Sequence, residues 1–240
     1  MKILAIDTAT EACSVALKMP QKNISRFEIC PQQHSQRLLP MVDEVLKEAE
    51  VTLGDIDLLA FGRGPGSFTG VRIATGMIQG LALGTGLKVA GVSTLEAMAC
   101  EVAEKISQQA QGTQYIAVAS DARMDEVYFA VFAINDNGLA LCVEEQVCAP
   151  DVVIGHLEAL NVNAANMVVA GTGWAAYEPL STWLEAQNVG LPGSVTLPNA
   201  KYMLSLAARV FDDKKAVDAV DVEPVYLRDK VTWKKLPGRE

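Results

Sequence analysis

Two aspartates stand just after strand-like runs, one in each half of the chain. Asp7 lies in Ala5-Ile-Asp-Thr-Ala-Thr10 and Asp121 lies in Ala119-Ser-Asp-Ala-Arg123. Acidic and hydroxyl side chains at strand ends are typical of paired hairpins that hold a phosphate and a hydrated magnesium ion. The same residues also suit plain turns, so a phosphate cleft, functional or vestigial, and a turn without chemistry both stay open.

A third loop, Gly171-Thr-Gly-Trp174, follows another strand-like run and has the glycine spacing of a backbone that approaches a nucleotide. This spacing is common after strands, so a plain turn is the stronger alternative here. The residues of the predicted phosphate-type loops are Asp7, Thr8, Thr10, Asp121, Arg123, Gly171 and Gly173.

The sequence predicts no metal site and no catalytic set. His34 and His156 are far apart, and neither has a partner at ligand spacing. Ser67 lies in a glycine-rich turn that is not a Gly-x-Ser-x-Gly motif, so we expect it to cap a helix.

Composition limits the classes of partner. Lysine and arginine number 20 against 29 aspartates and glutamates, a net charge of -9. This balance argues against unaided binding to nucleic acid or to an anionic membrane, which needs clustered cations. Five cysteines without a Cys-x-x-Cys pair predict reduced thiols and a cytoplasmic protein. The basic C-terminal end is either a solvated tail or a contact for a phosphate or an acidic partner.

The segment from Phe61 to Gly84 is rich in glycine. The first glycines suit a turn in which a Cβ would be in the way: Gly64, Gly66 and Gly70. Three more repeat every fourth residue along one face of a predicted helix: Gly76, Gly80 and Gly84. Together these three cost the helix about 3 kcal/mol relative to alanine. Apart from Arg72, Thr75 and Gln79 the helix is apolar all round, so we expect it to be covered on every side, in part by another molecule.

Predicted elements repeat in the same order in the two halves. Each half predicts three strands, a helix, a strand and a helix, which indicates two similar α/β lobes, each βββαβα, facing a cleft. We expect a first lobe over 1–107, a second over 108–198, and a C-terminal segment with a basic tail over 214–240. A helix over 199–213 is expected to join the first lobe. A further helix is predicted over 36–50, and it either begins near Pro40 or bends there. Another helix is predicted over 175–187.

Four motifs resemble the TsaB (YeaZ) family, part of the wider TsaD/TsaB group that also carries the older label of M22 glycopeptidase-like proteins. They cover residues 3–17, 61–73, 121–124 and 224–228. The resemblance implies the duplicated actin/Hsp70-like (ASKHA) fold. It also implies a subunit of the complex that forms N6-threonylcarbamoyladenosine, or t6A, at position 37 of tRNA.

The resemblance further implies a subunit without chemistry of its own. The catalytic TsaD relatives bind a metal through two histidines four residues apart, and the matching positions here hold Thr94 and Met98. The implied partners are a TsaD-like catalytic subunit and a TsaE-like ATPase, with tRNA met only through the complex. No cofactor is expected on this subunit alone, and ATP or ADP is expected in the complex.

The family pairs through two helices of the first lobe, and members can also form homodimers through that surface. The interface residues implied here are Leu38, Leu39, Val42, Val45, Leu46, Ile73, Gly76, Met77, Gly80, Leu81 and Gly84. Two other classes stay open as alternatives. One is an ATP-dependent enzyme or a metallo-glycopeptidase of the same fold, and the other is a stable homodimer with no chemistry.

Overall fold

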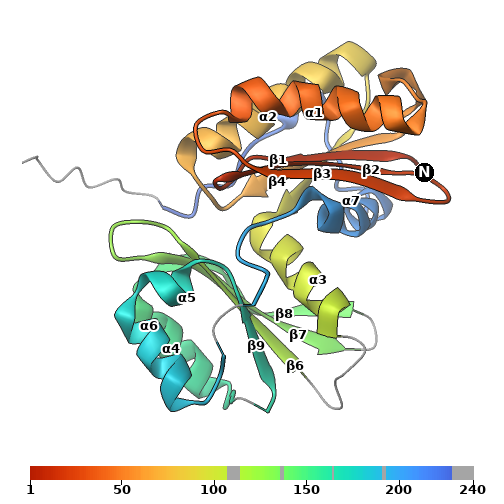
Figure 1. Ribbon diagram of the computed structural model, residues 1–240. Helices are drawn as coiled ribbons and strands as arrows, with labels where there is room; N and C mark the ends of the chain where they lie inside the picture. Colours follow the sequence, from red (N-terminus) through yellow and green to blue (C-terminus); the bar gives the residue numbers. More distant parts are fainter. Residues whose placement is uncertain (107–113, 136–137, 164, 191–192, 229–240) are drawn as a thin grey trace, which may run out of the picture.

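The protein is described by a computed structural model over residues 1–106, 114–135, 138–163, 165–190 and 193–228 (Figure 1). The chain forms two α/β lobes, each built on one sheet. The first sheet has the order β3-β2-β1-β4-β5, formed by β1 (Ile3–Asp7), β2 (Ala12–Lys18), β3 (Asn23–Ile29), β4 (Leu58–Gly64) and β5 (Val89–Ser93). The second has the order β8-β7-β6-β9, formed by β6 (Gln114–Asp121), β7 (Val127–Asn135), β8 (Gly138–Cys148) and β9 (Met167–Ala170).

The two sheets repeat one topology. In the first, β2 pairs antiparallel with β1 and β3, while β1 and β4 run parallel. In the second, β7 pairs antiparallel with β6 and β8, while β6 and β9 run parallel. The predicted duplication is therefore confirmed.

Helices cover both faces of the first sheet. On one face lie α1 (His34–Ala49) and α2 (Phe68–Thr85), and on the other lies α7 (Met203–Asp212) (Figure 1). Strand β1 is buried at every residue. Leu4 and Ile6 belong to the core under α1 and α2, whereas Ile3 and Ala5 belong to the core with α7. Burial on both faces explains why this strand reads as a continuous apolar run.

The second sheet also lies between helices. One side carries α4 (Pro150–Ala159), α5 (Gly173–Ala176) and α6 (Glu178–Ala186), and the other carries α3 (Thr94–Ile106). Leu95 and Met98 of α3 pack with Ile116 and Phe132 of the second sheet. A division at residue 107 would place α3 with the first lobe, so helix packing crosses that predicted boundary. The predicted linker at 107–113 and the tail at 229–240 lie outside the described residues.

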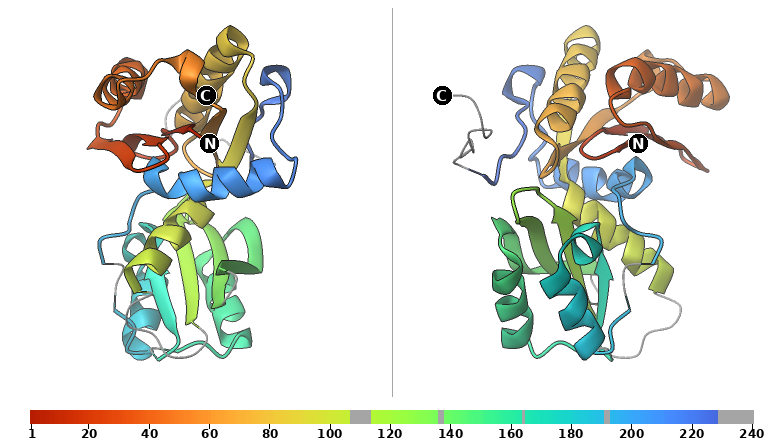
Figure 2. Two further views of the ribbon diagram at one scale, coloured as in Figure 1. Left: turned by 90° about the vertical axis from the view of Figure 1, so that its right-hand side faces the viewer. Right: turned by 60° about the vertical axis from the view of Figure 1, so that its left-hand side comes forward.

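Short 3-10 helices complete the fold: η1 (Leu53–Asp55), η2 (Ala200–Tyr202) and η3 (Ala219–Asp221). The helix expected over 199–213 is formed by η2 and α7. It packs on the first sheet, and both views of Figure 2 show α7 between that sheet and the second lobe. Within the described ranges, no helix is both long and apolar enough to span a bilayer.

Two predicted helices differ in their bounds. Helix α1 begins at His34, so Pro40 lies in its interior and not at its start. The helix predicted over 175–187 is two helices, because Tyr177 is extended, with φ -126°, between α5 and α6. Pro179 stands in the first turn of α6, where a missing amide hydrogen is tolerated.

Candidate functional site

The glycine-rich turn between β4 and α2 packs directly on the hairpin that joins β1 and β2. A Cβ built on Gly66 would lie 2.4 Å from the Ala9 carbonyl oxygen, and one on Gly70 would lie 2.1 Å from that of Thr8. The amide of Ser67 donates to the Ala9 oxygen over 2.7 Å. These glycines are therefore required by a close approach of two backbones.

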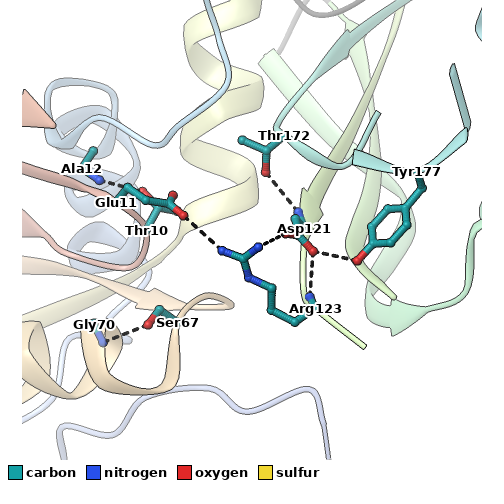
Figure 3. Close-up of polar contacts among 9 residues, drawn as sticks. All are labelled: Thr10, Glu11, Ala12, Ser67, Gly70, Asp121, Arg123, Thr172 and Tyr177. Carbon is teal, nitrogen blue, oxygen red and sulfur yellow. Dashed lines mark hydrogen bonds and ion pairs between the residues drawn. The ribbon is translucent and has the colours of Figure 1, made fainter. Parts of the chain in front are cut away.

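Ser67 is the N-cap of α2, as predicted. Its Oγ accepts a hydrogen bond from the Gly70 amide over 3.4 Å (Figure 3). This contact satisfies one of the free amides at the start of the helix.

Helix α2 has one buried and one open face. The buried side chains of Val71, Ala74 and Ile78 pack toward the first sheet. The three glycines of the helical repeat lie on the other face, where a Cβ would meet no atom of another described segment within 4 Å: Gly76, Gly80 and Gly84. The helix is thus not covered on every side by its own chain, and the glycine face is open.

Apolar side chains surround these glycines. Ile73, Met77 and Leu81 are half-buried against the first core. Leu83 is 70% exposed and Phe68 is 64% exposed, and both belong to α2. Sequence reasoning missed these last two, although Leu83 stands three residues after Gly80 and so shares its helix face. We call Phe68, Gly76, Gly80, Leu83 and Gly84 the open face of α2.

Most of the interface residues implied on α1 are buried. Four of them lie in the protein's own core and have little surface to offer to a partner: Leu38, Val42, Val45 and Leu46. Their helical spacing is that of an amphipathic helix packing on its own sheet, which an interface helix shares. Leu39 is the exception, since it is 45% exposed.

Asp7, the last residue of β1, is wholly buried beside Gly62 of β4 and Met203 of α7. A Cβ on Gly62 would lie 1.8 Å from its Oδ2 and 3.2 Å from Met203 Cε. Oδ1 accepts from the Ala9 amide over 3.2 Å, while Oδ2 has no partner among the described residues. Burial raises the pKa of this carboxyl from 3.8 to about 7, against the opposing effect of the Ala9 hydrogen bond.

The neighbours of Asp7 serve the turn. The Thr8 hydroxyl donates to the Gly70 oxygen over 2.7 Å. Thr10 Oγ1 accepts from the Ala12 amide over 3.3 Å, as Figure 3 shows. The Asp7 carboxylate has no exposed atom to offer to a phosphate. Of the two alternatives for this loop, a phosphate cleft and a plain turn, these contacts favour the plain turn.

The corresponding loop of the second lobe faces the first lobe. Asp121 Oδ1 accepts from the Tyr177 hydroxyl over 2.7 Å and from the Arg123 amide over 2.8 Å, and Thr172 Oγ1 accepts from the Asp121 amide (Figure 3). The Arg123 guanidinium lies 2.8 Å from Asp121 Oδ2 and 3.6 Å from Glu11 Oε1. Burial and the bond to Asp121 raise the pKa of Tyr177 to about 12.

The Asp121 carboxylate is thus engaged by its own chain, and the Arg123 side chain reaches across to the first lobe. The glycines of the third loop also have a structural role. A Cβ on Gly171 would lie 2.2 Å from the Ala119 oxygen, and one on Gly173 would lie 2.7 Å from Val127 Cγ1. The two aspartates, which stand at matching positions in the two halves of the sequence, therefore have different surroundings. Asp7 is buried, whereas Asp121 binds Tyr177 and Arg123.

Thr94 and Met98, which the resemblance aligns with metal-binding histidines, are core positions. Thr94 is buried and its hydroxyl donates to the Pro65 oxygen over 2.5 Å. Met98 is buried in the core that joins α3 to the second sheet. Over the described ranges, no three side chains of the His, Cys, Asp or Glu type gather as a metal site would require. His156 lies 3.1 Å from the Gln146 amide nitrogen and stacks on Phe129.

Two lobes of one repeated topology, each with a strand-end aspartate and a glycine-lined turn, define the duplicated actin/Hsp70-like fold. The sequence model of the TsaD family, described as tRNA N6-adenosine threonylcarbamoyltransferase, matches residues 27–235. The chain belongs to the TsaB (YeaZ) family within this group.

Three relatives illustrate the match. The tRNA threonylcarbamoyladenosine biosynthesis protein TsaB of Escherichia coli K12 is 47% identical over 241 residues, covering 100% of both chains. TsaB of Haemophilus influenzae is 44% identical, covering 100% of this chain and 99% of its own. A crystal structure of a Pseudomonas aeruginosa protein similar to the peptidase YeaZ has a TM-score of 0.81 at 41% identity, covering 95% of this chain and 99% of that one.

Proposed function

We propose that this protein is a non-catalytic scaffold and activator in the cytoplasmic complex that forms t6A at position 37 of tRNA. It pairs through the open face of α2 with a TsaD-like catalytic subunit. A TsaE-like ATPase joins the same assembly, and tRNA is met only through the complex. In the absence of the partner, a second copy of the chain takes the same place.

The open glycine face is the observation that carries this proposal. Three glycines in one helix cost about 3 kcal/mol relative to alanine, and nothing within 4 Å makes use of the missing side chains. A backbone free of side chains allows a second helix to approach closely. The exposed Leu83 and Phe68 beside the glycines give such a contact apolar area to bury.

The match to the TsaD family supports the choice of partner. The matched residues, 27–235, include all of α2, and the proposal assigns the TsaD-like subunit a helix at the corresponding place. Two related chains can then meet through the same helix on each side, as the subunits of a two-fold dimer do.

Two placements support a role without chemistry of its own. Asp7 is wholly buried and presents no carboxylate to a phosphate. Thr94 and Met98 are buried in the core and offer no ligand to a divalent ion. The proposal therefore assigns no metal and no nucleotide to this subunit alone, and places ATP or ADP in the assembled complex.

The substitution Gly80→Leu tests the docking surface. Its side chain would stand in open space, so the fold is expected to persist while the partner is displaced. Affinity for a purified TsaD-like subunit, measured by calorimetry, is expected to fall at least ~100-fold. Gly155→Leu is a matched control, because Gly155 is an exposed glycine of α4 that also has no atom within 4 Å of its Cβ position.

Retention of the partner by Gly80→Leu would overturn the proposal. Light scattering of the protein alone gives a second reading, since the same change is expected to convert a homodimer to monomers. A wild-type homodimer that excludes the TsaD-like subunit would favour the alternative of a dimer without a role in t6A.

Cells depleted of the protein test the pathway. The t6A content of bulk tRNA, measured by nucleoside mass spectrometry, is expected to fall. Wild-type protein and Gly155→Leu are expected to restore it, and Gly80→Leu is not. Turnover of ATP by the purified protein alone, or an unchanged t6A level, would instead favour an enzyme of the same fold.

A further inference from the structure

Residues 222–228 form a segment, here called the C-terminal strap, that runs from the first lobe to the second. It follows η3 and passes along the edge of α2 before it reaches the β6–β7 turn (Figure 1). No role assigned above involves this segment.

The start of the strap is fixed to the first lobe. The Gln79 side-chain amide, on α2, donates to the Val222 oxygen over 3.1 Å, and Val222 is buried in the first core. Further along, the Val225 amide donates to the Arg63 oxygen over 2.7 Å. The Val225 oxygen would lie 3.0 Å from a Cβ on Gly64, whose φ is +100°. The strap thus adds to the end of β4, beside the glycine turn.

The middle of the strap meets the open face of α2. Tyr226 lies beside Phe68, with ring centroids 6.1 Å apart and planes inclined by 37°. The Arg72 guanidinium carbon lies 3.2 Å from the Phe68 ring centroid and 4.7 Å from that of Tyr226. Tyr226 is 44% exposed, so this cluster of two aromatic rings and one arginine extends the open face.

The end of the strap is fixed to the second lobe. Arg228 donates through both Nε and Nη2 to Glu126 Oε2, over 3.1 and 2.5 Å, and through Nη2 to the Arg123 oxygen over 3.3 Å. The turn that it binds is strained, because Arg123, Met124 and Asp125 are three successive residues with φ near +60°. Arg123 is also the residue that reaches Glu11 of the first lobe.

We propose that Arg72 and Tyr226 extend the docking surface beyond Phe68 and the rest of the open face of α2, and that the strap couples docking at α2 to the position of the second lobe. This inference rests on the proposed function, since the occupant is the same TsaD-like subunit. A partner that packs on Tyr226 restrains the strap, and the strap restrains the β6–β7 turn through Arg228. Binding and lobe position then influence each other, because coupling between two sites is reciprocal.

The chemistry of the cluster favours a protein partner over RNA. Tyrosine, phenylalanine and arginine are enriched at the centres of protein interfaces, and this cluster is continuous with the apolar face of α2. The chain carries a net charge of -9, which opposes direct contact with a phosphate backbone. RNA contact is therefore left as an outcome of the test.

Affinity for the TsaD-like subunit, measured by calorimetry, tests the surface. Tyr226→Ala and Phe68→Ala are each expected to weaken binding about 10-fold or more, as loss of a central aromatic residue does. Tyr226→Phe keeps the ring and is expected to bind as the wild type does. Phe211→Ala is the matched control, because Phe211 is an aromatic residue of α7 with 40% exposure on the opposite face of the first sheet.

Glu126→Gln tests the coupling. Glu126 lies on the second lobe, and its substitution removes the ion pair to Arg228 without changing any residue of α2. Binding of the TsaD-like subunit is expected to weaken about 3- to 10-fold, a typical size for coupling between two sites. Asp213→Asn, which removes the exposed ion pair to Lys215 at the end of α7, is expected to have no effect. In the wild type, the partner is expected to slow amide exchange at residues 122–126, and Glu126→Gln is expected to abolish that protection.

Gly80→Leu, measured alongside, separates this inference from the proposed function. If Gly80→Leu still binds, the proposed function fails. If Gly80→Leu loses the partner while Tyr226→Ala and Glu126→Gln match their controls, only the strap inference is overturned. It is also overturned if Phe68→Ala leaves subunit affinity intact but weakens binding of tRNA to the assembled complex, because the cluster then belongs to RNA.

Discussion

Six of the glycines from β4 to the end of α2 fall into two groups with opposite surroundings. A Cβ on Gly62, Gly66 or Gly70 would overlap an atom of the first hairpin. A Cβ on Gly76, Gly80 or Gly84 would meet nothing. The first group is needed for the chain to fold, whereas the second group makes the helix weaker without any return inside the chain. Glycine therefore occurs in this one segment for two separate reasons. The first group is required by packing within the chain, and we infer that the second group is required by a partner.

The largest expected effect is that of Gly70→Ala. Its methyl group would stand 2.1 Å from the Thr8 oxygen, so backbone must move to admit it. The free energy of unfolding is expected to fall by about 3 kcal/mol. Urea unfolding followed by circular dichroism measures the change, with Gly76→Ala, six residues further on, as the matched control. An equal effect of the two substitutions would erase the distinction between the groups.

Asp7→Asn tests the dry packing around Gly62. The unfolded chain releases the Asp7 proton near pH 3.8 and the folded chain keeps it to about pH 7, so the folded state binds more protons between these values. Stability from this group is therefore lost as pH rises through that window. The asparagine variant has no proton to lose, and its advantage over the wild type is expected to grow by about 2 kcal/mol between pH 5.5 and pH 8.5.

Unfolding of both proteins at the two pH values measures this difference. A constant difference between the variant and the wild type would show that Asp7 is not held protonated by its surroundings. That result would also mean that the space beside Gly62 admits water, which would weaken the contrast with the open glycines.

The smallest expected effect is that of Gly80→Ala, and its sign is opposite to that of Gly70→Ala. Gly80→Ala places a methyl group in open space on a helix, so the free energy of unfolding is expected to rise by about 1 kcal/mol. A gain in stability together with weaker binding of the TsaD-like subunit would sharpen the comparison, because it would show stability given up for a contact. A loss of stability would mean that the chain itself uses the bare face.

Sequence reasoning predicted what local pattern dictates. The duplicated order of elements, the glycine turn and the Ser67 cap follow from spacing and residue type, and the fold confirms them. The resemblance implies an interface on α1, but the spacing of Leu38 and Val42 is the same whether these residues face a sheet or a partner, and both lie in the first core. Only the packed structure distinguishes the two.

Long-range packing also determines the burial of Asp7. Its strand-end position predicts an exposed ligand, but Gly62 of β4 and Met203 of α7 enclose it, and neither is close in sequence. The sequence does not predict the strap for the same reason. Its role depends on Arg228 meeting Glu126, a pair that is 102 positions apart.

The packing of α7 has a consequence for synthesis of the chain. Ile3, Ala5, Leu58 and Ala60 form one apolar face of the first sheet, and α7 covers that face. The ribosome makes these strands before the second lobe and makes residues 203–212 after it. The first lobe therefore cannot close its core until the second lobe has been translated, and a product that stops before Met203 leaves a bare sheet surface open to aggregation.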